Sequence, residues 1–170
     1  MELTLEEAIV LKLMTKMKEA RGTIDKLALE KLVFLVAHGE FDEKGELVGL
    51  KTFPRIEADY RVYFRGVHSR DVYEIVERLI EKGLVDKLDG EYEVHETAPI
   101  QLPGDLARIL DYVARYASYT PKELERLTNR LLGIKDDLAK ALVFNASVVR
   151  LLKAREEARK LREKGLLVDI

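Results

Sequence analysis

The 170-residue chain contains no cysteine. This absence excludes disulfides, thiolate zinc sites and cysteine nucleophiles together. Side-chain amides are also scarce, since they occur only at Gln101, Asn129 and Asn145. Few amides, no cysteine and a 35% share of charged residues are typical of heat-adapted proteins, so we expect a thermophilic origin.

The chain also lacks any apolar run near the ~18 residues that a membrane span requires. Its first residues, 1–7, are acidic, whereas a secretory signal begins with a basic stretch and an apolar run. We therefore expect a cytoplasmic protein that has no membrane partner. An excess of positive charge is missing as well: the net charge is -2 and the pI is about 6.0. Because nucleic-acid binders are usually basic overall, any such function must depend on a local patch.

Two helices are predicted at the start of the chain. Thr4 and Glu7 have the spacing of a capping box, and apolar residues then recur every four positions over about 5–20, up to Gly22. A second helix begins after Thr23 and ends near His38. Its apolar face consists of Leu29, Leu32, Val33 and Val36.

The clearest element covers 69–82. Ser69 is a suitable N-cap, and a buried stripe is indicated by apolar residues at helical spacing. Gly83 ends this helix. Two extended runs, 84–88 and 92–95, then flank Asp89-Gly90, and an Asp-Gly pair in this setting is a strong hairpin signal.

This order of elements predicts a mainly α (α+β) fold with a winged helix-turn-helix core, a small β-hairpin wing and a C-terminal helical extension. We expect a winged-helix domain over 1–98, with an insertion at about 39–60, and a helical extension over 99–170 that packs on it. Short extended pieces are predicted over 47–53 and 56–64. The extension should contain helices that begin at Pro103 and Thr120, and one long charged helix over 136–163.

Two stretches resemble a known family. The first combines Leu29–Leu35, which contains the letters KLVFL, with 60–85, where Gly66-Val67-His68-Ser69 opens a helix that ends in Gly83-Leu84. The second is 112–129, which ends in Leu127-Thr128-Asn129. These motifs are similar to those of the Panacea and SocA-like antitoxin domains and the related YwgA-like proteins. Val67 stands where that family has a proline, and Asn129 where it has a histidine. The resemblance implies a winged-helix-like, non-enzymatic regulatory or interaction protein.

No catalytic motif is evident. His38, His68 and His95 do not have a metal-ligand spacing, and we interpret them as surface or loop histidines. His68 beside Ser69 is a poor base–nucleophile pair, because adjacent side chains rarely have that geometry. The glycines fit neither a P-loop nor a dinucleotide fingerprint, and the acids near Asp42 lack an EF-hand pattern. We therefore predict no enzyme activity, no cofactor and no metal.

A basic patch with interleaved aromatic residues lies between 51 and 70, and it suits contact with double-stranded DNA. The helix expected to enter the major groove carries both basic and acidic residues, among them Glu74, Glu77 and Glu81, and the wing turn is likewise mixed. A solvated strand with core aromatics is the alternative interpretation of the patch. The predicted nucleic-acid-binding residues are Lys51, Arg55, Arg61, Arg65, Arg70, Tyr73, Arg78 and Lys87.

The last helix is a candidate dimer contact. It has seven basic residues and three acids over 150–164, and apolar residues recur along it at spacings of three and four. Packing onto its own core is one interpretation, and pairing with a second copy is the other. The residues predicted to form a homodimer are Phe144, Val148, Leu151, Ala158 and Leu161.

Three functions follow as hypotheses. The first is a winged-helix transcription regulator that binds DNA as a homodimer. The second is a non-enzymatic protein-interaction module, an antitoxin-like partner, in which the winged helix is only a scaffold. The acidic helix over 69–82 favours the module, whereas the patch over 51–70 favours DNA. A small hydrolase with a composite site is the third and weakest hypothesis.

Overall fold

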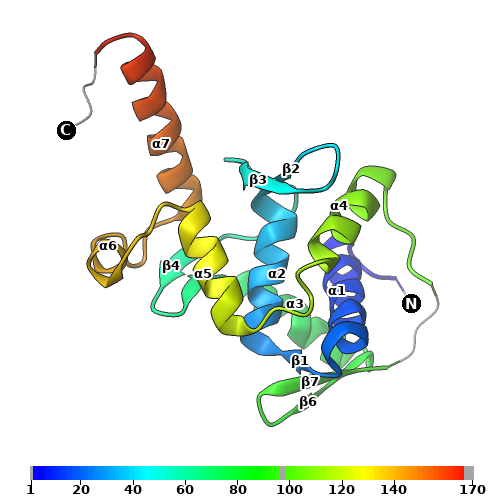
Figure 1. The fold of residues 1–170 in the computed structure, drawn as a ribbon. Coiled ribbons are helices and arrows are strands. Elements are labelled where there is room, and N and C mark those ends of the chain that lie inside the picture. The colour runs from blue at the N-terminus through cyan, green and yellow to red at the C-terminus, as the bar shows by residue number, and fades with distance from the viewer. Residues whose placement is uncertain (1, 96–98, 167–170) are drawn as a thin grey trace.

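The computed structural model describes residues 2–95 and 99–166, which form an α+β fold (Figure 1). The helices in this part of the chain are α1 (Leu5–Arg21), α2 (Lys26–His38), α3 (Arg70–Glu81), α4 (Gly104–Ala114), α5 (Pro121–Leu131), α6 (Asp137–Leu142) and α7 (Val148–Glu163). The strands are β1 (Ile24–Asp25), β2 (Gly39–Phe41), β3 (Leu47–Leu50), β4 (Arg61–Tyr63), β5 (Gly66–His68), β6 (Val85–Leu88) and β7 (Glu91–Val94).

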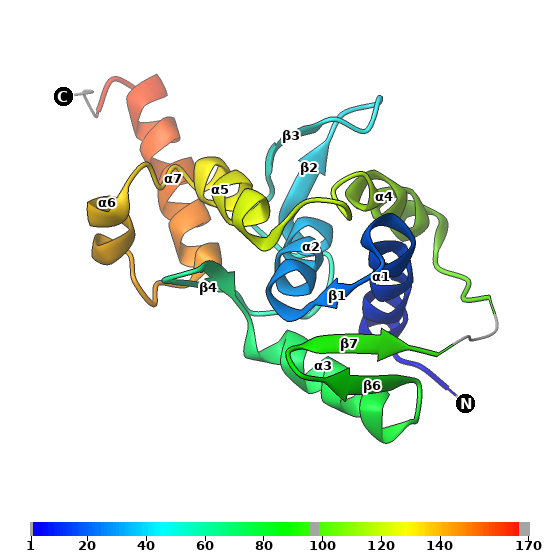
Figure 2. The ribbon, with the colours of Figure 1, turned by 60° about the horizontal axis from the view of Figure 1, so that its bottom comes forward.

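The expected hairpin is present as β6 and β7, which pair antiparallel with Leu88 opposite Glu91. Both residues of the turn have positive φ, 30° at Asp89 and 82° at Gly90, which is the backbone that an Asp-Gly turn favours. β1 pairs with β7 through Ile24 opposite Tyr92, so the sheet has the order β1-β7-β6 (Figure 2). The prediction of the hairpin is confirmed, whereas the two-residue strand β1 was missed.

The helix α2 lies at the centre of the fold and contacts α1, α4, α5 and β5. Every residue from Ala28 to His38 is buried, so this helix has no solvent-facing side over that length. Our prediction of one apolar face was therefore too narrow. A helix that neighbours surround on all sides also buries its polar side chains, and each of these then needs a partner.

The segment between α2 and α3 forms two separate hairpins, β2 with β3 and β4 with β5. The extended pieces predicted over 47–53 and 56–64 are shorter than expected, because only Leu47–Leu50 and Arg61–Tyr63 are strands. Neither hairpin joins the β1-β7-β6 sheet. The β4–β5 hairpin instead lies between α2 and α5, and it carries the glycine at position 66 into the interior.

The long helix predicted over 136–163 is wrong, since a break at 143–147 separates α6 from α7. Asn145 takes a left-handed conformation with φ 64°, and its N–H donates to the Val62 carbonyl oxygen at 2.7 Å. The Val62 N–H donates in turn to the Ala146 carbonyl oxygen. Ser147 then caps α7 through its hydroxyl. Backbone pairing with β4 therefore replaces helix over these residues.

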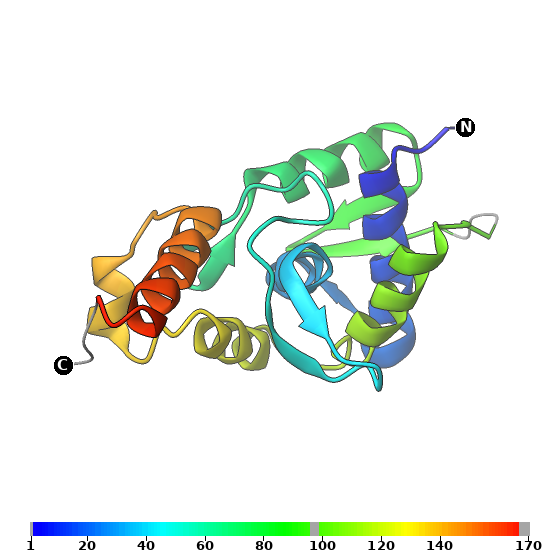
Figure 3. The same cartoon turned by 90° about the horizontal axis from the view of Figure 1, so that it is seen from above.

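The helices α5, α6 and α7 lie together on one side of the molecule, with α1, α4 and the three-stranded sheet on the other and α2 between them (Figure 3). Only the first turns of α7 pack on the body, where Val148 and Leu152 are buried. The rest of α7 extends away from the body in Figure 1, and its side chains after Leu152 are mostly exposed.

Candidate functional site

Two adjacent charged residues of α2, Glu30 and Lys31, are buried with exposed fractions of 1% each. Glu30 Oε1 accepts a hydrogen bond from the Ser69 N–H at 2.9 Å and lies 2.6 Å from His68 Nδ1. A carboxylate oxygen only accepts, so this imidazole nitrogen carries the proton. The Glu30 side chain therefore joins α2 to the junction between β5 and α3.

Tyrosines enclose the same carboxylate. The Tyr60 hydroxyl donates to the Glu30 carbonyl oxygen at 2.7 Å, and the pKa of Tyr60 is raised by its burial and by the nearby charge of Glu30. Burial likewise raises the pKa of Tyr73, whose hydroxyl bonds the Glu30 side chain. Burial also raises the pKa of Glu30, against the opposing effects of Lys31, the Ser69 amide and His68. Several polar groups therefore meet at the Glu30 carboxylate.

Lys31 differs from Glu30 in that its ammonium has no hydrogen bond to any described residue. Its nearest acidic atom is Glu30 Oε2 at 4.0 Å, which is a charge pair without hydrogen-bond geometry. Burial lowers the pKa of Lys31, with Glu30 and Glu125 opposing that effect. An ammonium normally uses three donors, so a buried one without an acceptor is costly to hold.

Lys31 lines two adjoining hollows. One, of about 300 Å³, lies between α2, the β4–β5 hairpin and Phe144. The other, of about 610 Å³, lies between α2, the turn of that hairpin and the N-terminal end of α5. Its charged lining residues are four cations, Lys31, Arg65, Lys122 and Lys140, and one acid, Glu125. We call this second space the cationic hollow.

Gly66 lies where the β4–β5 hairpin packs closely against α2 and α5, beside the cationic hollow. Its φ is +95°, and a Cβ at this position would lie 3.2 Å from both Lys31 Cε and Glu125 Cγ. The Asn129 side chain is the next neighbour, and its Oδ1 is buried without a hydrogen-bond partner among the described residues. Residues from α2, β5 and α5 thus converge here.

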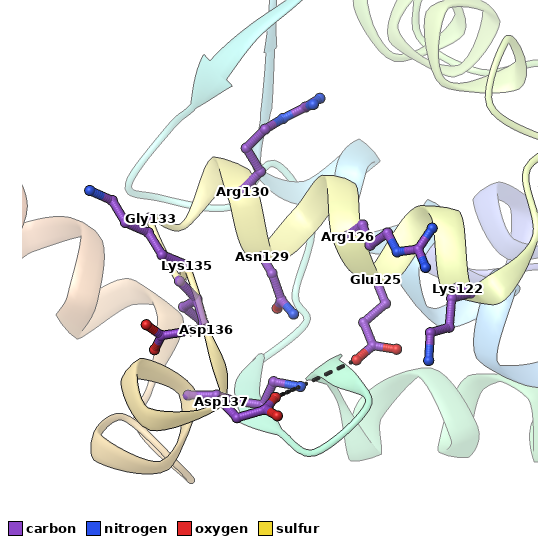
Figure 4. A pocket seen from close by; sticks show the side chains of 11 residues that line it. Lys122, Glu125, Arg126, Asn129, Arg130, Gly133, Lys135, Asp136 and Asp137 are labelled. Atoms are coloured by element: carbon purple, nitrogen blue, oxygen red, sulfur yellow. Dashed lines mark hydrogen bonds and ion pairs between the residues drawn. The ribbon is translucent and has the colours of Figure 1, made fainter.

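A further hollow of about 580 Å³ continues from the cationic hollow between α5 and α6 (Figure 4). The side chains of Glu125 and Asn129 point into it from α5. Lys140 reaches across from α6, with its Nζ 3.4 Å from Glu125 Oε1 and 2.9 Å from the Phe64 carbonyl oxygen. These contacts fix α6 against the β4–β5 turn.

Aromatic rings form the outer rim of this region. The Tyr63 ring stacks on His68 at 4.6 Å and lies 5.6 Å from Phe144, whose ring is 4.6 Å from Phe64. Phe64 is 73% exposed, and Leu142, two residues before Phe144, is 79% exposed. We call Phe64, Leu142 and Phe144 the apolar cluster. It lies beside the cationic hollow, because Phe64 belongs to this cluster and also lines that hollow.

A fourth hollow of about 1060 Å³ lies between β3, the loop after it and α7. Lys51, Arg130, Arg155 and Arg159 are among its cations, and its acids are Glu40 and Glu156. The exposed Val48 and Phe53 also line it. Cationic hollows with apolar residues beside them therefore occur on both sides of α5. We call six of the cations that line them, Lys51, Arg65, Lys122, Arg130, Lys140 and Arg159, the basic face.

Charge is divided unequally along the chain. Residues 120–170 contain twelve Lys and Arg against eight Asp and Glu, whereas residues 1–119 contain seventeen against twenty-three. The helices α5, α6 and α7 belong to the basic part. The helix α3 and the β6–β7 hairpin belong to the acidic part, and they expose carboxylates from Glu74, Glu77, Glu81, Asp86, Asp89, Glu91 and Glu93.

The predicted nucleic-acid-binding residues do not form one patch. Lys51 lines the hollow beside α7, and Arg65 lines the cationic hollow. Arg70 lies at the start of α3, whereas Lys87 is in the β6–β7 hairpin, and both are exposed. Their spread over four segments leaves DNA binding through this set a prediction.

Four others of the set make contacts within the chain. Arg55 donates to the Val36 carbonyl oxygen at 3.0 Å, and Arg61 donates to the Asn145 carbonyl oxygen at 2.9 Å. The Arg78 guanidinium lies 3.8 Å from the buried Glu7 carboxylate. Tyr73 is half-buried against Glu30, with the Lys26 ammonium 4.2 Å from the centre of its ring. These contacts stabilise the fold and reduce what each side chain can offer to a ligand.

The predicted dimer residues are divided between two environments. Phe144 is not on the last helix, because it lies in the break before α7. Val148 is fully buried within the chain, and Leu151 packs against the same core. Ala158 and Leu161 lie on the projecting part of α7, where Leu161 is 41% exposed. Intrachain packing therefore explains the first part of the stripe, and dimerisation through the rest stays a prediction.

The histidines have three different settings, and their interpretation as surface or loop residues is wrong for His38. That side chain is fully buried at the end of α2, with Nδ1 2.9 Å from the Lys51 carbonyl oxygen and a pKa lowered by burial. His68 binds Glu30, whereas His95 is exposed with Nε2 2.8 Å from Asp86. Over residues 2–95 and 99–166, no group of three or more His, Asp or Glu has the geometry to hold a metal ion.

Comparison of the chain with protein-family models, with curated proteins and with solved structures gives no match. Among the helices of the described residues, none combines the length and the apolarity that a membrane crossing requires. The site is therefore interpreted from its own chemistry.

The central residues of the site, Glu30 and Lys31, were missed by sequence reasoning. The prediction for the helix that contains them covered only its apolar face and assigned no role to these two residues. A signal was present, since the segment from Leu27 to Ala37 contains only these two charged residues. A charged pair inside an otherwise apolar helix indicates burial on all sides with internal pairing.

Proposed function

We propose that the chain is a winged-helix protein that works as a protein-interaction module and binds an acidic partner on its basic face. The assignment of a winged helix is supported by the order α1-β1-α2-α3-β6-β7 and by the sheet order β1-β7-β6. In this assignment α3 is the third helix and the β6–β7 hairpin is the wing. The two hairpins between α2 and α3 are the insertion expected at about 39–60, and they extend it to His68.

The helix α3 and the wing are poorly suited to DNA. DNA affinity comes mainly from neutralised phosphates, and exposed carboxylates oppose it. The outer side of α3 presents Glu74, Glu77 and Glu81, and the wing adds Asp86 and Glu91. The Arg78 guanidinium is also partly engaged within the chain, because it lies 3.8 Å from the buried Glu7 carboxylate. The winged helix is therefore proposed as a scaffold.

The observation that carries the proposal is the combination of the basic face with exposed apolar side chains. Leu138 and Leu142 of α6 are 71% and 79% exposed, and both lie on the same side of that helix. Aromatic rings alone would suit nucleic acid, because bases stack on them. Aliphatic side chains cannot stack on bases, whereas protein interfaces bury them at their centre. An acidic protein segment with apolar residues matches both features.

A binding experiment with two defined probes tests this function. One probe is a fluorescein-labelled peptide of glutamate and leucine, and the other is a labelled random DNA duplex. We expect the peptide to raise fluorescence anisotropy at a salt concentration where the duplex does not bind. Leu142→Ser and Phe144→Ser remove apolar contacts without changing charge, and each should weaken peptide binding several-fold. Glu74→Gln on α3 is the matched control and should leave it unchanged.

The opposite pattern would contradict the proposal. If the duplex binds more tightly than the peptide, and Leu142→Ser and Phe144→Ser leave both unchanged, the basic face is a nucleic-acid surface. A peptide in which lysine replaces glutamate controls for apolar adhesion, and its equal binding would also count against an acidic partner.

DNA binding is the second candidate, and one observation favours it. The helix α7 projects from the body and carries six basic residues against three acids. Such an arm could follow a phosphate backbone. Arg65→Glu is the variant for this test, because Arg61 holds the Asn145 carbonyl oxygen and its loss would disturb the fold. A shift of duplex DNA that disappears with Arg65→Glu and with rising salt would support this second function.

A further inference from the structure

The lining of the cationic hollow carries more positive than negative charge, with four cations and one acid. Lys31 has the Glu30 carboxylate at 4.0 Å, and Lys140 has Glu125 at 3.4 Å. Arg65 and Lys122 make no ion pair or hydrogen bond through their side chains within residues 2–95 and 99–166. Like charges gathered around one concave space repel each other unless an anion enters it.

We propose that the cationic hollow is an anion-binding site that takes a carboxylate or phosphate group, with the Lys31 ammonium at its base. The site itself does not depend on the proposed function. Only the source of the anion does, because an acidic side chain of a protein partner would reach this hollow from the neighbouring apolar cluster.

Lys31 is the first argument for an anion. The side chain is 1% exposed, and its ammonium has no hydrogen bond among the described residues, yet it lines both hollows beside the β4–β5 hairpin. An ammonium in such a place keeps its charge at a cost, and an oxyanion would supply the missing acceptors. The lowered pKa of Lys31 agrees with this, since burial is its main cause.

The walls of the hollow provide the second argument. Gly66 lets the β4–β5 turn approach Lys31 and Glu125 more closely than any side chain would allow. Pro121 and Thr120 bring the N-terminal end of α5, where the helix dipole is positive, to the same space. Lys140 is held by Glu125 and the Phe64 carbonyl oxygen, so its charge has a fixed position.

The lining donors require a hydrogen-bond acceptor, and their positive charge favours an anionic one. Ammonium and guanidinium groups have donors and no acceptors, so a cation or a neutral donor finds no partner among them. A space of about 610 Å³ is larger than a single phosphate or carboxylate group requires, so the group would be part of a larger ligand or would enter with water. Arginine forks and lysine ammoniums bind both kinds of oxyanion, which is why the two sources must be separated by experiment.

The test uses ¹⁵N-labelled full-length protein and two probes, inorganic phosphate and the glutamate–leucine peptide, at constant ionic strength. Amide signals of Gly66 and Lys122 report on the hollow. We expect saturable shifts at these positions, and affinity at least tenfold weaker in Lys31→Met and in Lys122→Glu. Lys122 is exposed, so its variant should fold even if Lys31→Met does not. Lys153→Glu on α7 is the matched control for net charge and should bind as the wild type does.

Binding of both probes, lost in both variants, supports the site and places the partner's carboxylate in it. Binding of phosphate alone supports the site and identifies a free anion as its ligand, which leaves the proposed function to its own test. Peptide binding that is unchanged in Lys31→Met and Lys122→Glu overturns the site without touching the proposed function. Shifts that do not saturate, or that are the same in all variants, also overturn it.

Discussion

The Glu30 carboxylate lies 2.6 Å from the His68 imidazole, and this contact joins the central helix to the strand that precedes α3. The same carboxylate oxygen accepts the Ser69 N–H, so a single buried side chain holds the β5–α3 junction in place. Lys31, the next residue, lines the cationic hollow, and both residues line the smaller hollow beside His68. The stability of the core and the shape of the candidate site therefore depend on neighbouring residues of one helix turn.

Glu30→Ala should lower the free energy of unfolding by about 3–5 kcal/mol, because it leaves the Lys31 charge and the Ser69 N–H without their partner. Urea unfolding at neutral pH measures this loss. The double variant Glu30→Ala/Lys31→Met removes the stranded charge as well, and it should recover part of the loss. The contrary result is that Lys31→Met costs as much stability in the Glu30→Ala background as it costs in the wild type. The two side chains would then not be coupled.

The lowered pKa of Lys31 predicts a difference at high pH. Between its folded pKa and the ordinary value of 10.5, this lysine binds more protons in the unfolded chain than in the folded one. Its contribution to the free energy of unfolding therefore rises with pH over that range. The wild type should therefore gain stability relative to Lys31→Met as the pH rises towards 10.5. Titrating tyrosines affect both proteins and cancel in the comparison. A constant difference between the two proteins across this range would mean that Lys31 is not desolvated.

Lys82→Met should destabilise the protein by ~3 kcal/mol at neutral pH, since it removes the close partner of a buried carboxylate. Lys82 Nζ lies 2.7 Å from both oxygens of Glu7, whose side chain is 1% exposed. Burial raises the pKa of Glu7, but the Lys82 and Thr4 hydrogen bonds together outweigh it and leave that pKa lowered. The stability that the Glu7 carboxylate contributes is fully present above pH 4.5, and it is lost as the pH falls through the lowered pKa.

Thermal or urea unfolding of the wild type and the Lys82 variant at neutral and at acid pH checks the direction of this pH dependence. The gap between wild type and variant should narrow in acid, where Glu7 becomes protonated in both. Lys87→Met in the exposed hairpin is the control and should change stability by less than about 0.5 kcal/mol. An equal gap at both pH values would show that Lys82 acts through packing alone.

Gly66→Ala should cost about 1–3 kcal/mol, because a side chain at φ +95° is strained and its Cβ would crowd Lys31 and Glu125 at 3.2 Å. Gly90→Ala is the matched control: its φ is +82°, but no described atom lies within 4 Å of the added carbon. Gly66→Ala should therefore be the more destabilising of the two in urea unfolding, and it should also weaken phosphate binding. Equal losses of stability in the two variants would mean that the effect comes from the backbone conformation and not from crowding of Lys31 and Glu125.

Local signals made much of this fold predictable. The Thr4–Glu7 and Thr120–Glu123 capping boxes and the Asp89-Gly90 turn are present as the sequence indicated, because each depends on residues close together in the chain. The break before α7 was missed although Asn145 and Ser147 marked it. An apolar spacing that fitted one continuous helix concealed these signals, and the pairing of Asn145 with Val62 depends on residues far apart in sequence.

The candidate site was less predictable than the fold. Arg65 was identified because it lies in a basic stretch, whereas Lys31 was not, since its role depends on what surrounds α2 in space. Lys122 and Lys140 come from helices whose placement against the β4–β5 hairpin is a tertiary relationship. Charge counting along the sequence cannot find a hollow built from four separate segments.

A photo-crosslinking measurement in cells that make this protein tests the central claim, that a protein partner occupies the basic face. A photoreactive amino acid is placed at Leu142 in one protein and at Glu74 of α3 in another. We predict adducts from position 142 that resist nuclease, are destroyed by protease and disappear with Arg65→Glu, and no such adducts from position 74. Adducts formed from position 74 alone, or adducts from position 142 that nuclease removes, would contradict the account.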